Sequence, residues 1–247
     1  VILIVGPTGS GKSTTMCAMI RELCREETNI MTLEDPVEYN IPGANQCQIN
    51  EKTGMTFAVG LRSILRQDPD VISVGEIRDG ETASIAVRAA ITGHLVLSTL
   101  HTNDAVSTIG RLVDIGVEPY MIASALRGVV SQRLVRKICP HCRKPYTPTA
   151  DEKIMLGIDE DADVQFYKGQ GCQECNHLGN RGRRAVFEIL TVDRPLRRQI
   201  TDDPDTDKLK ALALKQGLVT MKDNCRELVL RGEISFPEAA RAISSMT

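Results

Sequence analysis

The sequence contains no tryptophan, and aromatic residues make up only 3% of its 247 residues. Few aromatic side chains leave few platforms on which nucleic-acid bases can stack. The 30 lysine and arginine residues are balanced by 32 aspartate and glutamate residues, so the chain lacks the basic surplus typical of proteins that bind nucleic acids or anionic lipids. Both shortages argue against a nucleic-acid partner.

Long apolar runs are also missing. No stretch approaches the ~20 residues that a membrane-spanning helix needs, and no signal peptide opens the chain. We therefore expect a soluble, intracellular protein with no transmembrane segment. The chain starts inside the strand-like run VILIV without an initiating methionine, so we also expect a fragment that lacks an upstream portion.

The stretch GPTGSGKST follows this apolar run directly and is the most informative part of the chain. Its glycines let backbone N–H groups converge on an anion at the start of a helix, while Lys12 reaches the β- and γ-phosphates and Ser13 holds Mg²⁺. The competing interpretation is a glycine turn with a stray lysine, but the helix-compatible stretch from Thr14 to Arg25 favours a phosphate loop. The residues expected to bind the nucleoside triphosphate are Gly6, Pro7, Thr8, Gly9, Ser10, Gly11, Lys12, Ser13 and Thr14.

Strand-like and helix-like segments alternate from residue 1 to about residue 137. This alternation predicts an α/β fold with a predominantly parallel sheet covered by helices. The predicted strands are Val1–Val5, Asn29–Leu33, Val71–Val74 and Leu95–Leu100. Helices are predicted around Phe57 to Leu65, from Glu81 to Ile91, from Ala105 to Ile115 and from Pro119 to about Ile138.

Polar residues follow each predicted strand, at the edge where ligands bind in open α/β sheets. A triphosphate site needs one carboxylate in the Mg²⁺ shell and another that orients or deprotonates the attacking water. We assign Glu76 to the metal shell, together with Ser13, and Glu34 to the water, with Asp35 beside it as a further nucleotide-binding residue. Either glutamate alone could instead be a helix-capping or surface acid.

Two histidines flank the last predicted strand, and we expect both to lie at the same edge, beside Lys12. His101 falls nearer the carboxyl end and could read the γ-phosphate or shuttle a proton. His94 could also contact the phosphates, and a satisfied core histidine is an equally fair interpretation. Three arginines, Arg62, Arg66 and Arg78, could contact phosphates or simply lie on solvated helix faces.

Four of the eight cysteines form two C-x-x-C pairs, Cys139 with Cys142 and Cys172 with Cys175. Four thiolates on two tight turns predict structural Zn²⁺ with no open position for catalysis. Redox dithiols are the main competing interpretation, and His141 or His177 could replace one cysteine. The other four cysteines are scattered and are expected to be buried fillers.

Four motifs in this order resemble the secretion ATPases that assemble type IV pili and drive type II secretion. In that family they are the phosphate loop, the aspartate box, a glutamate-ended Walker B and the histidine box. The matching segments here are GPTGSGKST, TLEDPVEY (32–39), RQDPDVISVGEIRD (66–79) and TGHLVLSTLHTNDA (92–105). The resemblance covers the whole chain, because the assembly branch also has a four-cysteine metal subdomain before a helical tail.

The resemblance implies an ATPase that converts ATP to ADP and phosphate and couples this to mechanical work. It implies a RecA-like P-loop core over residues 1–137, a zinc subdomain over 138–186 and a helical C-terminal subdomain over 187–247. It further implies a homo-hexameric ring that is cytoplasmic, peripheral at the inner membrane, and in contact with a membrane platform protein. The family places another domain upstream, so we expect this fragment to bind nucleotide but hydrolyse it slowly.

Two alternatives from other classes stay open at this point. One is a P-loop nucleotide phosphotransferase with a zinc-stapled lid, although here the cysteines come after all four strand ends. The other is a RecA-like nucleic-acid motor, which the balanced charge and scarce aromatics disfavour. The motifs do not separate pilus assembly from protein secretion.

Overall fold

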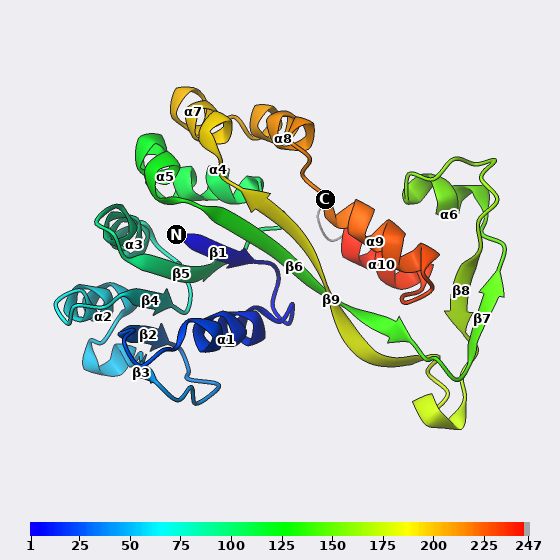
Figure 1. Cartoon of the computed structure of the whole chain (residues 1–247), viewed down its shortest axis with the longest axis horizontal. Helices are drawn as coiled ribbons and strands as arrows, with labels where there is room; N and C mark the ends of the chain where they lie inside the picture. The colour runs from blue at the N-terminus through cyan, green and yellow to red at the C-terminus, as the bar shows by residue number, and fades with distance from the viewer. Residues whose placement is uncertain (245–247) are drawn as a thin grey trace. The chain divides into compact units, whose positions relative to one another are not determined.

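The computed structural model describes residues 1–244, which form two compact units (Figure 1). Unit 1 consists of Val1–Ser131 and Ile189–Leu218, and unit 2 consists of Gln132–Glu188 and the chain from Val219 onward. The strands β6 (Gly128–Ile138) and β9 (Asn180–Thr191) contribute residues to both units. The boundaries expected at residues 137 and 186 therefore fall inside strands.

Unit 1 is built on a mainly parallel sheet whose strands follow the order β3-β2-β4-β5-β1-β6-β9. All the pairings from β3 to β6 are parallel, as predicted. The four predicted strands are confirmed within one residue at each end. The first five strands are β1 (Ile2–Val5), β2 (Ile30–Glu34), β3 (Ala44–Gln48), β4 (Val71–Val74) and β5 (Leu95–Leu100).

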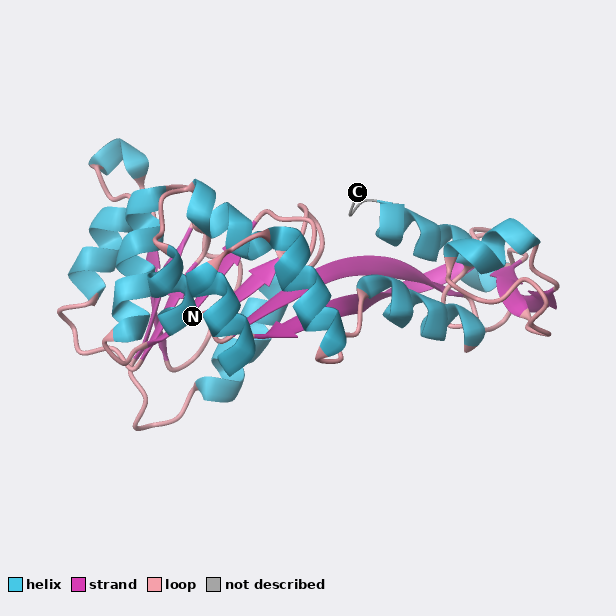
Figure 2. Ribbon diagram, turned by 90° about the horizontal axis from the view of Figure 1, so that it is seen from above, coloured by secondary structure: helices cyan, strands magenta, loops and turns pink. Residues whose placement is uncertain are grey.

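Helices cover both faces of this sheet, and the side-chain alternation of the strands explains why (Figure 2). Ile4 packs with Met16 and Ile20 of α1, whereas its neighbours Leu3 and Val5 belong to the larger core on the other face. That second core takes in residues from the remaining helices of the unit. The helices are α1 (Lys12–Leu23), α2 (Phe57–Ile64), α3 (Gly80–Ile91), α4 (Ser107–Asp114), α5 (Pro119–Ala125), α7 (Arg194–Asp202) and α8 (Thr206–Lys215).

The helix expected from Pro119 to about Ile138 is wrong in its second half. α5 ends at Ala125, and β6 begins at Gly128. The start of β6 pairs in parallel with β1, with Ile2 opposite Gly128 and Ile4 opposite Val130. Apolar residues in this stretch suit either structure, but the β-branched pair Val129-Val130 and pairing with a buried strand favour β structure.

The strand β3 was not predicted, because its sequence ANQCQ is polar. It lies at one end of the sheet order and pairs in parallel with β2, so Thr32 is opposite Gln46 and Glu34 is opposite Gln48. A short 3-10 helix, Glu51–Thr53, follows it.

Unit 2 contains an antiparallel pair, β7 (Arg143–Tyr146) with β8 (Phe166–Gly169), and the helices α6 (Ala150–Met155), α9 (Met221–Leu230) and α10 (Phe236–Ser244). Its small core centres on buried Phe166, whose ring centroid lies 6.1 Å from that of Tyr146 and 6.3 Å from that of Phe236. The expected helical tail over 187–247 is shared between the units, since α7 and α8 belong to unit 1. No helix in the described part of the chain is long and apolar enough to cross a membrane.

Candidate functional site

The phosphate loop joins β1 to α1 as the sequence predicts. Gly6, Gly9 and Gly11 have φ angles of 144°, 77° and 89°, which are backbone conformations that residues with a Cβ rarely adopt. The ammonium group of Lys12 donates to the carbonyl oxygens of Gly6 at 2.8 Å and Pro7 at 3.1 Å, so it lies over the loop. Ser13 and Thr14 are exposed in the first turn of α1.

Parallel pairing brings the ends of four strands to the same edge as this loop. Val5 is opposite Leu100, so β1 and β5 end together, and Leu33 is opposite Val74, so β2 and β4 end together. Glu34, Glu76 and His101 come at or just after these ends. The structure therefore places these three residues at the edge that holds the phosphate loop.

Glu76 is the centre of a charged cluster at this edge. One of its carboxylate oxygens accepts a hydrogen bond from Arg78, and the other lies 3.6 Å from Nε2 of His101. The same guanidinium group lies 3.7 Å from the carboxylate of Asp35. The hydrogen bond to Glu76 is the main cause that raises the pKa of Arg78 above its usual value, so this arginine stays cationic.

The backbone before Glu76 is fixed by the neighbouring strands. Gly75 donates from its N–H to the Leu33 carbonyl at 2.7 Å, and Thr99 donates from its hydroxyl to the Gly75 carbonyl at 2.7 Å. A Cβ on Gly75 would lie 3.0 Å from the Leu33 carbonyl oxygen, so this close approach of β4 to β2 favours glycine. The backbone directly before Glu76 is thus anchored to both neighbouring strands, which positions this carboxylate.

Glu34 is held by a separate set of contacts. Its Oε1 accepts hydrogen bonds from the Thr32 hydroxyl at 2.7 Å and from the Gln46 side-chain amide at 2.8 Å. Sequence reasoning missed Gln46 because it lies on the polar strand that was not predicted. The only signal that could have found it is the polar face that Thr32 and Glu34 share.

The structure corrects the placement of His94. β5 begins at Leu95, so His94 lies at the amino end of that strand, whereas His101 follows its carboxyl end. Six strand residues at roughly 3.3 Å each separate the two ends by about 20 Å. His94 instead has its Nδ1 2.9 Å from the Ala89 carbonyl at the end of α3. His94 therefore does not lie at the edge beside Lys12, which is the edge where ligands bind in open α/β sheets.

The arginines divide between the two interpretations left open above. Arg78 joins the Glu76 cluster, as described. Arg62 instead pairs with Glu81 at 2.6 Å on exposed surfaces of α2 and α3. Arg66 is exposed just after α2.

The four cysteines of the two C-x-x-C pairs come together in unit 2, and their sulfur atoms all lie within 4.8 Å of one another. Three of the separations are 3.7–3.9 Å. Sulfurs that are bound tetrahedrally at ~2.3 Å from a zinc ion lie about 3.8 Å apart, so these positions fit zinc. All four are free thiols at distances far beyond a disulfide bond, and neither His141 nor His177 belongs to the group.

Backbone donors favour the thiolate form at one of these cysteines, Cys175. Burial alone raises the pKa of the Cys175 thiol, but N–H donors from Cys172 and Gly179, each 3.3 Å from its sulfur, and neighbouring thiols lower that pKa to about 6. Thiolates are the form that binds metal. The expectation that Cys17 and Cys225 are buried is confirmed, whereas Cys24 and Cys47 are only partly buried.

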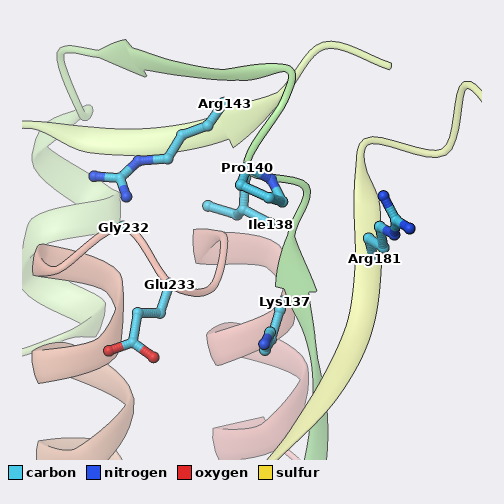
Figure 3. A pocket seen from close by; sticks show the side chains of 7 residues that line it. All are labelled: Lys137, Ile138, Pro140, Arg143, Arg181, Gly232 and Glu233. Atoms are coloured by element: carbon cyan, nitrogen blue, oxygen red, sulfur yellow. The ribbon is translucent and has the colours of Figure 1, made fainter. Parts of the chain in front are cut away.

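Unit 2 also contains a cavity of about 420 Å³, and its lining includes Pro140, which lies between the first pair of cysteines in the sequence (Figure 3). Three cationic side chains line it, from β6, β7 and β9. Arg143 packs 3.9 Å above the ring of Tyr167, Arg181 pairs with Glu174 at 3.0 Å, and Glu233 pairs with Arg184. The lining residues are Lys137, Ile138, Pro140, Arg143, Arg181, Gly232 and Glu233.

Comparison with known proteins gives consistent relatives. The type II secretion system protein E of Aeromonas hydrophila is 46% identical over 241 residues, which are 98% of this chain and 48% of that protein. The type IV pilus assembly ATPase PilB of Thermus thermophilus is 47% identical over 247 residues, which are 98% of this chain and 28% of that protein. The chain thus spans about half of these curated relatives or less.

Solved structures agree on the fold. The crystal structure of the pilus retraction motor PilT with bound ADP matches with a TM-score of 0.73 at 34% identity, over 98% of this chain and 60% of that chain. The X-ray structure of the ATPase DotB from Legionella pneumophila matches with a TM-score of 0.72 at 26% identity, over 98% and 59%. The family model described as "Type II/IV secretion system protein" matches residues 1–241, and the chain belongs to this family.

Proposed function

We propose that this chain is the nucleotide-hydrolysing part of a motor ATPase that powers type IV pilus assembly or type II protein secretion. The observation that supports this most directly is the gathering of Glu34, Glu76 and His101 at the sheet edge that holds the phosphate loop. Relatives named for both processes match at 46–47% identity over nearly the whole chain.

Each residue of this edge has a proposed role. The backbone N–H groups of the loop and the Lys12 ammonium group bind the β- and γ-phosphates. Ser13 and Glu76 would hold Mg²⁺, which when bound neutralises phosphate charge. Glu34 lies at the end of β2, which adjoins the end of β4 that precedes Glu76. From there its carboxylate orients the attacking water and accepts its proton.

Asp35 and His101 complete the site from either side of Glu76. Asp35 lies near Arg78 and contributes to nucleotide binding through that arginine. His101 is half-exposed beside Glu76, so its ring can reach the γ-phosphate or pass on a proton.

Substituting single residues separates binding from chemistry. Lys12→Ala should abolish ATP binding, whereas Glu34→Gln should retain binding and lower kcat by about 100-fold or more, as expected for loss of a general base. Steady-state hydrolysis together with binding of a fluorescent ATP analogue measures both effects. Wild-type hydrolysis by Glu34→Gln would contradict the assignment of Glu34.

The same assay distinguishes the alternative functions. A nucleotide phosphotransferase would consume ATP only when a nucleotide acceptor is added, and a RecA-like nucleic-acid motor would be stimulated by single-stranded DNA. We expect hydrolysis that needs no acceptor and is unchanged by DNA.

We further propose that the four cysteines bind one structural zinc ion and that unit 2 contacts a membrane platform component. The charged cavity of unit 2 supports the platform contact, because three cationic side chains outnumber the single acidic side chain in its lining. An acidic segment of the partner would complement it. We also propose that the chain works in a homo-hexameric ring and that this ring is cytoplasmic, at the inner membrane.

The proposed contact can be tested by reversing charge in the cavity. Lys137→Glu combined with Arg143→Glu should abolish binding to the platform component while ATP hydrolysis stays within about twofold of wild type, because neither residue is at the sheet edge. Co-purification from host membranes and an ATPase assay measure the two properties. Unchanged co-purification would place the contact elsewhere.

A further inference from the structure

The carboxylate of Glu34 is held by neighbouring side chains on one face of the β2–β3 pair. Thr32 and Glu34 are two residues apart on β2, so their side chains project from the same face of the sheet. Gln46 is opposite Thr32 across the parallel pair, which brings its side chain to that face too. Thr32 is fully buried, and Glu34 and Gln46 are half-buried.

The side chain of Gln46 makes three hydrogen bonds. Its Nε2 donates to Oε1 of Glu34 at 2.8 Å and to the Tyr39 carbonyl oxygen at 2.9 Å. Its Oε1 accepts from the Ile41 N–H at 2.8 Å. Gln46 therefore connects the carboxylate of Glu34 to the segment that follows Asp35, and it does so from a paired strand.

We propose that Gln46 is a positioning residue for ATP hydrolysis that fixes the rotamer of Glu34. Gln46 and Thr32 both donate to Oε1 of Glu34, and within the described residues no hydrogen bond reaches Oε2. This leaves Oε2 to orient the water and accept its proton. The inference rests on the role proposed above for Glu34.

Only an amide can make this set of contacts at position 46. Leucine of similar size loses all three bonds. Glutamate keeps an acceptor for Ile41 but places a second carboxylate against Glu34 and against the Tyr39 carbonyl, where donors are required. Both substitutions therefore release Glu34 while leaving the phosphate loop untouched.

The test compares kcat with KM for ATP in the purified protein. Because a misplacement of about 1 Å can cost up to 100-fold in rate, we expect Gln46→Leu and Gln46→Glu to lower kcat by about tenfold or more. KM and the Kd of an ATP analogue should stay within about twofold of wild type, since Gln46 does not reach the loop. Asn45→Leu is the matched control, because Asn45 precedes Gln46 on the same strand, its side chain projects from the opposite face, and it donates to Asn29 rather than to Glu34.

A second background distinguishes positioning from a general structural role. In Glu34→Gln, adding Gln46→Leu should cause no further loss of the residual rate, because Gln46 acts through Glu34. A further loss, a change confined to KM, or full activity of Gln46→Leu would overturn the inference. If Glu34→Gln itself retains full activity, the proposed role of Glu34 fails first, and the two failures are thus distinguishable.

Discussion

At the scale of single residues, Arg78 sets the charge balance of the sheet edge. It bonds to Glu76 and approaches Asp35, so one guanidinium group faces two carboxylates that a bound triphosphate would otherwise meet unscreened. The proposed chemistry needs carboxylates there, but their negative charge opposes the binding of phosphates. Arg78 is the side chain that offsets this repulsion.

Removing this cation should weaken the site. For Arg78→Gln we expect kcat/KM for ATP to fall by about tenfold or more, because charge-assisted hydrogen bonds are lost beside the nucleotide. Arg88→Gln, which removes an exposed arginine from α3, is the control and should stay within about twofold. Equal effects of the two substitutions would show that only overall charge matters.

A second prediction at this scale concerns pH. The Thr220 hydroxyl bonds to Asp223 at 2.6 Å and is the main cause that lowers the pKa of this carboxyl. A lowered folded-state pKa stabilises the protein above the unfolded value of about 4, and the stabilisation is lost as pH falls through the folded value. Between pH 5 and about pH 3, the free energy of unfolding of Asp223→Asn should therefore fall less than that of the wild type. Urea unfolding at both pH values measures this, with Asp207→Asn of α8 as the control.

At the scale of elements, close backbone contacts fix how the helices of unit 1 pack. A Cβ on Gly80, the first residue of α3, would lie 2.1 Å from the Ile115 carbonyl oxygen after α4. Backbone cannot move aside as a flexible side chain can. The start of α3, which follows the Glu76 segment, is therefore fixed against the end of α4.

Gly80→Ala should destabilise unit 1 by about 1–3 kcal/mol, as overpacking does. Gly110→Ala in α4 is the matched control, because the added Cβ meets only the Thr206 hydroxyl at 3.3 Å. We expect that control to change the unfolding free energy by less than about 1 kcal/mol. Thermal or urea unfolding decides, and equal stability of both variants would contradict the packing described.

Sequence patterns correctly predicted those elements whose structure depends mainly on their own residues. The four apolar strands and the polar residues that follow them gave the position of Glu34, Glu76 and His101. The patterns failed where pairing partners decide, as in the polar edge strand that contains Gln46 and in β6, whose apolar residues suit a helix equally well. His94 was misplaced because a histidine before a strand and one after it look alike until the strand direction is applied.

At the scale of the whole molecule, the two units hold different chemistry. Unit 1 contains the sheet edge, and unit 2 contains the four cysteines and a core of few large side chains. A small core of this kind gains much of its stability from a metal. The strands β6 and β9 contribute to both units, so the division falls within strands rather than in a linker.

Metal removal tests the role of zinc. Metal analysis should give about one zinc per chain, falling to near zero in Cys142→Ser with loss of ordered structure in unit 2. Cys225→Ser replaces another buried cysteine of unit 2 outside the cluster and should keep its zinc. Far less than one zinc per chain in the wild-type protein would refute the metal assignment.

The most direct test of the whole account is a crystal structure with Mg²⁺ and a non-hydrolysable ATP analogue. The account predicts that Lys12 contacts the γ-phosphate, that Ser13 and Glu76 belong to the Mg²⁺ shell, and that Glu34 faces the γ-phosphate from β2. A γ-phosphate bound away from these side chains would contradict it.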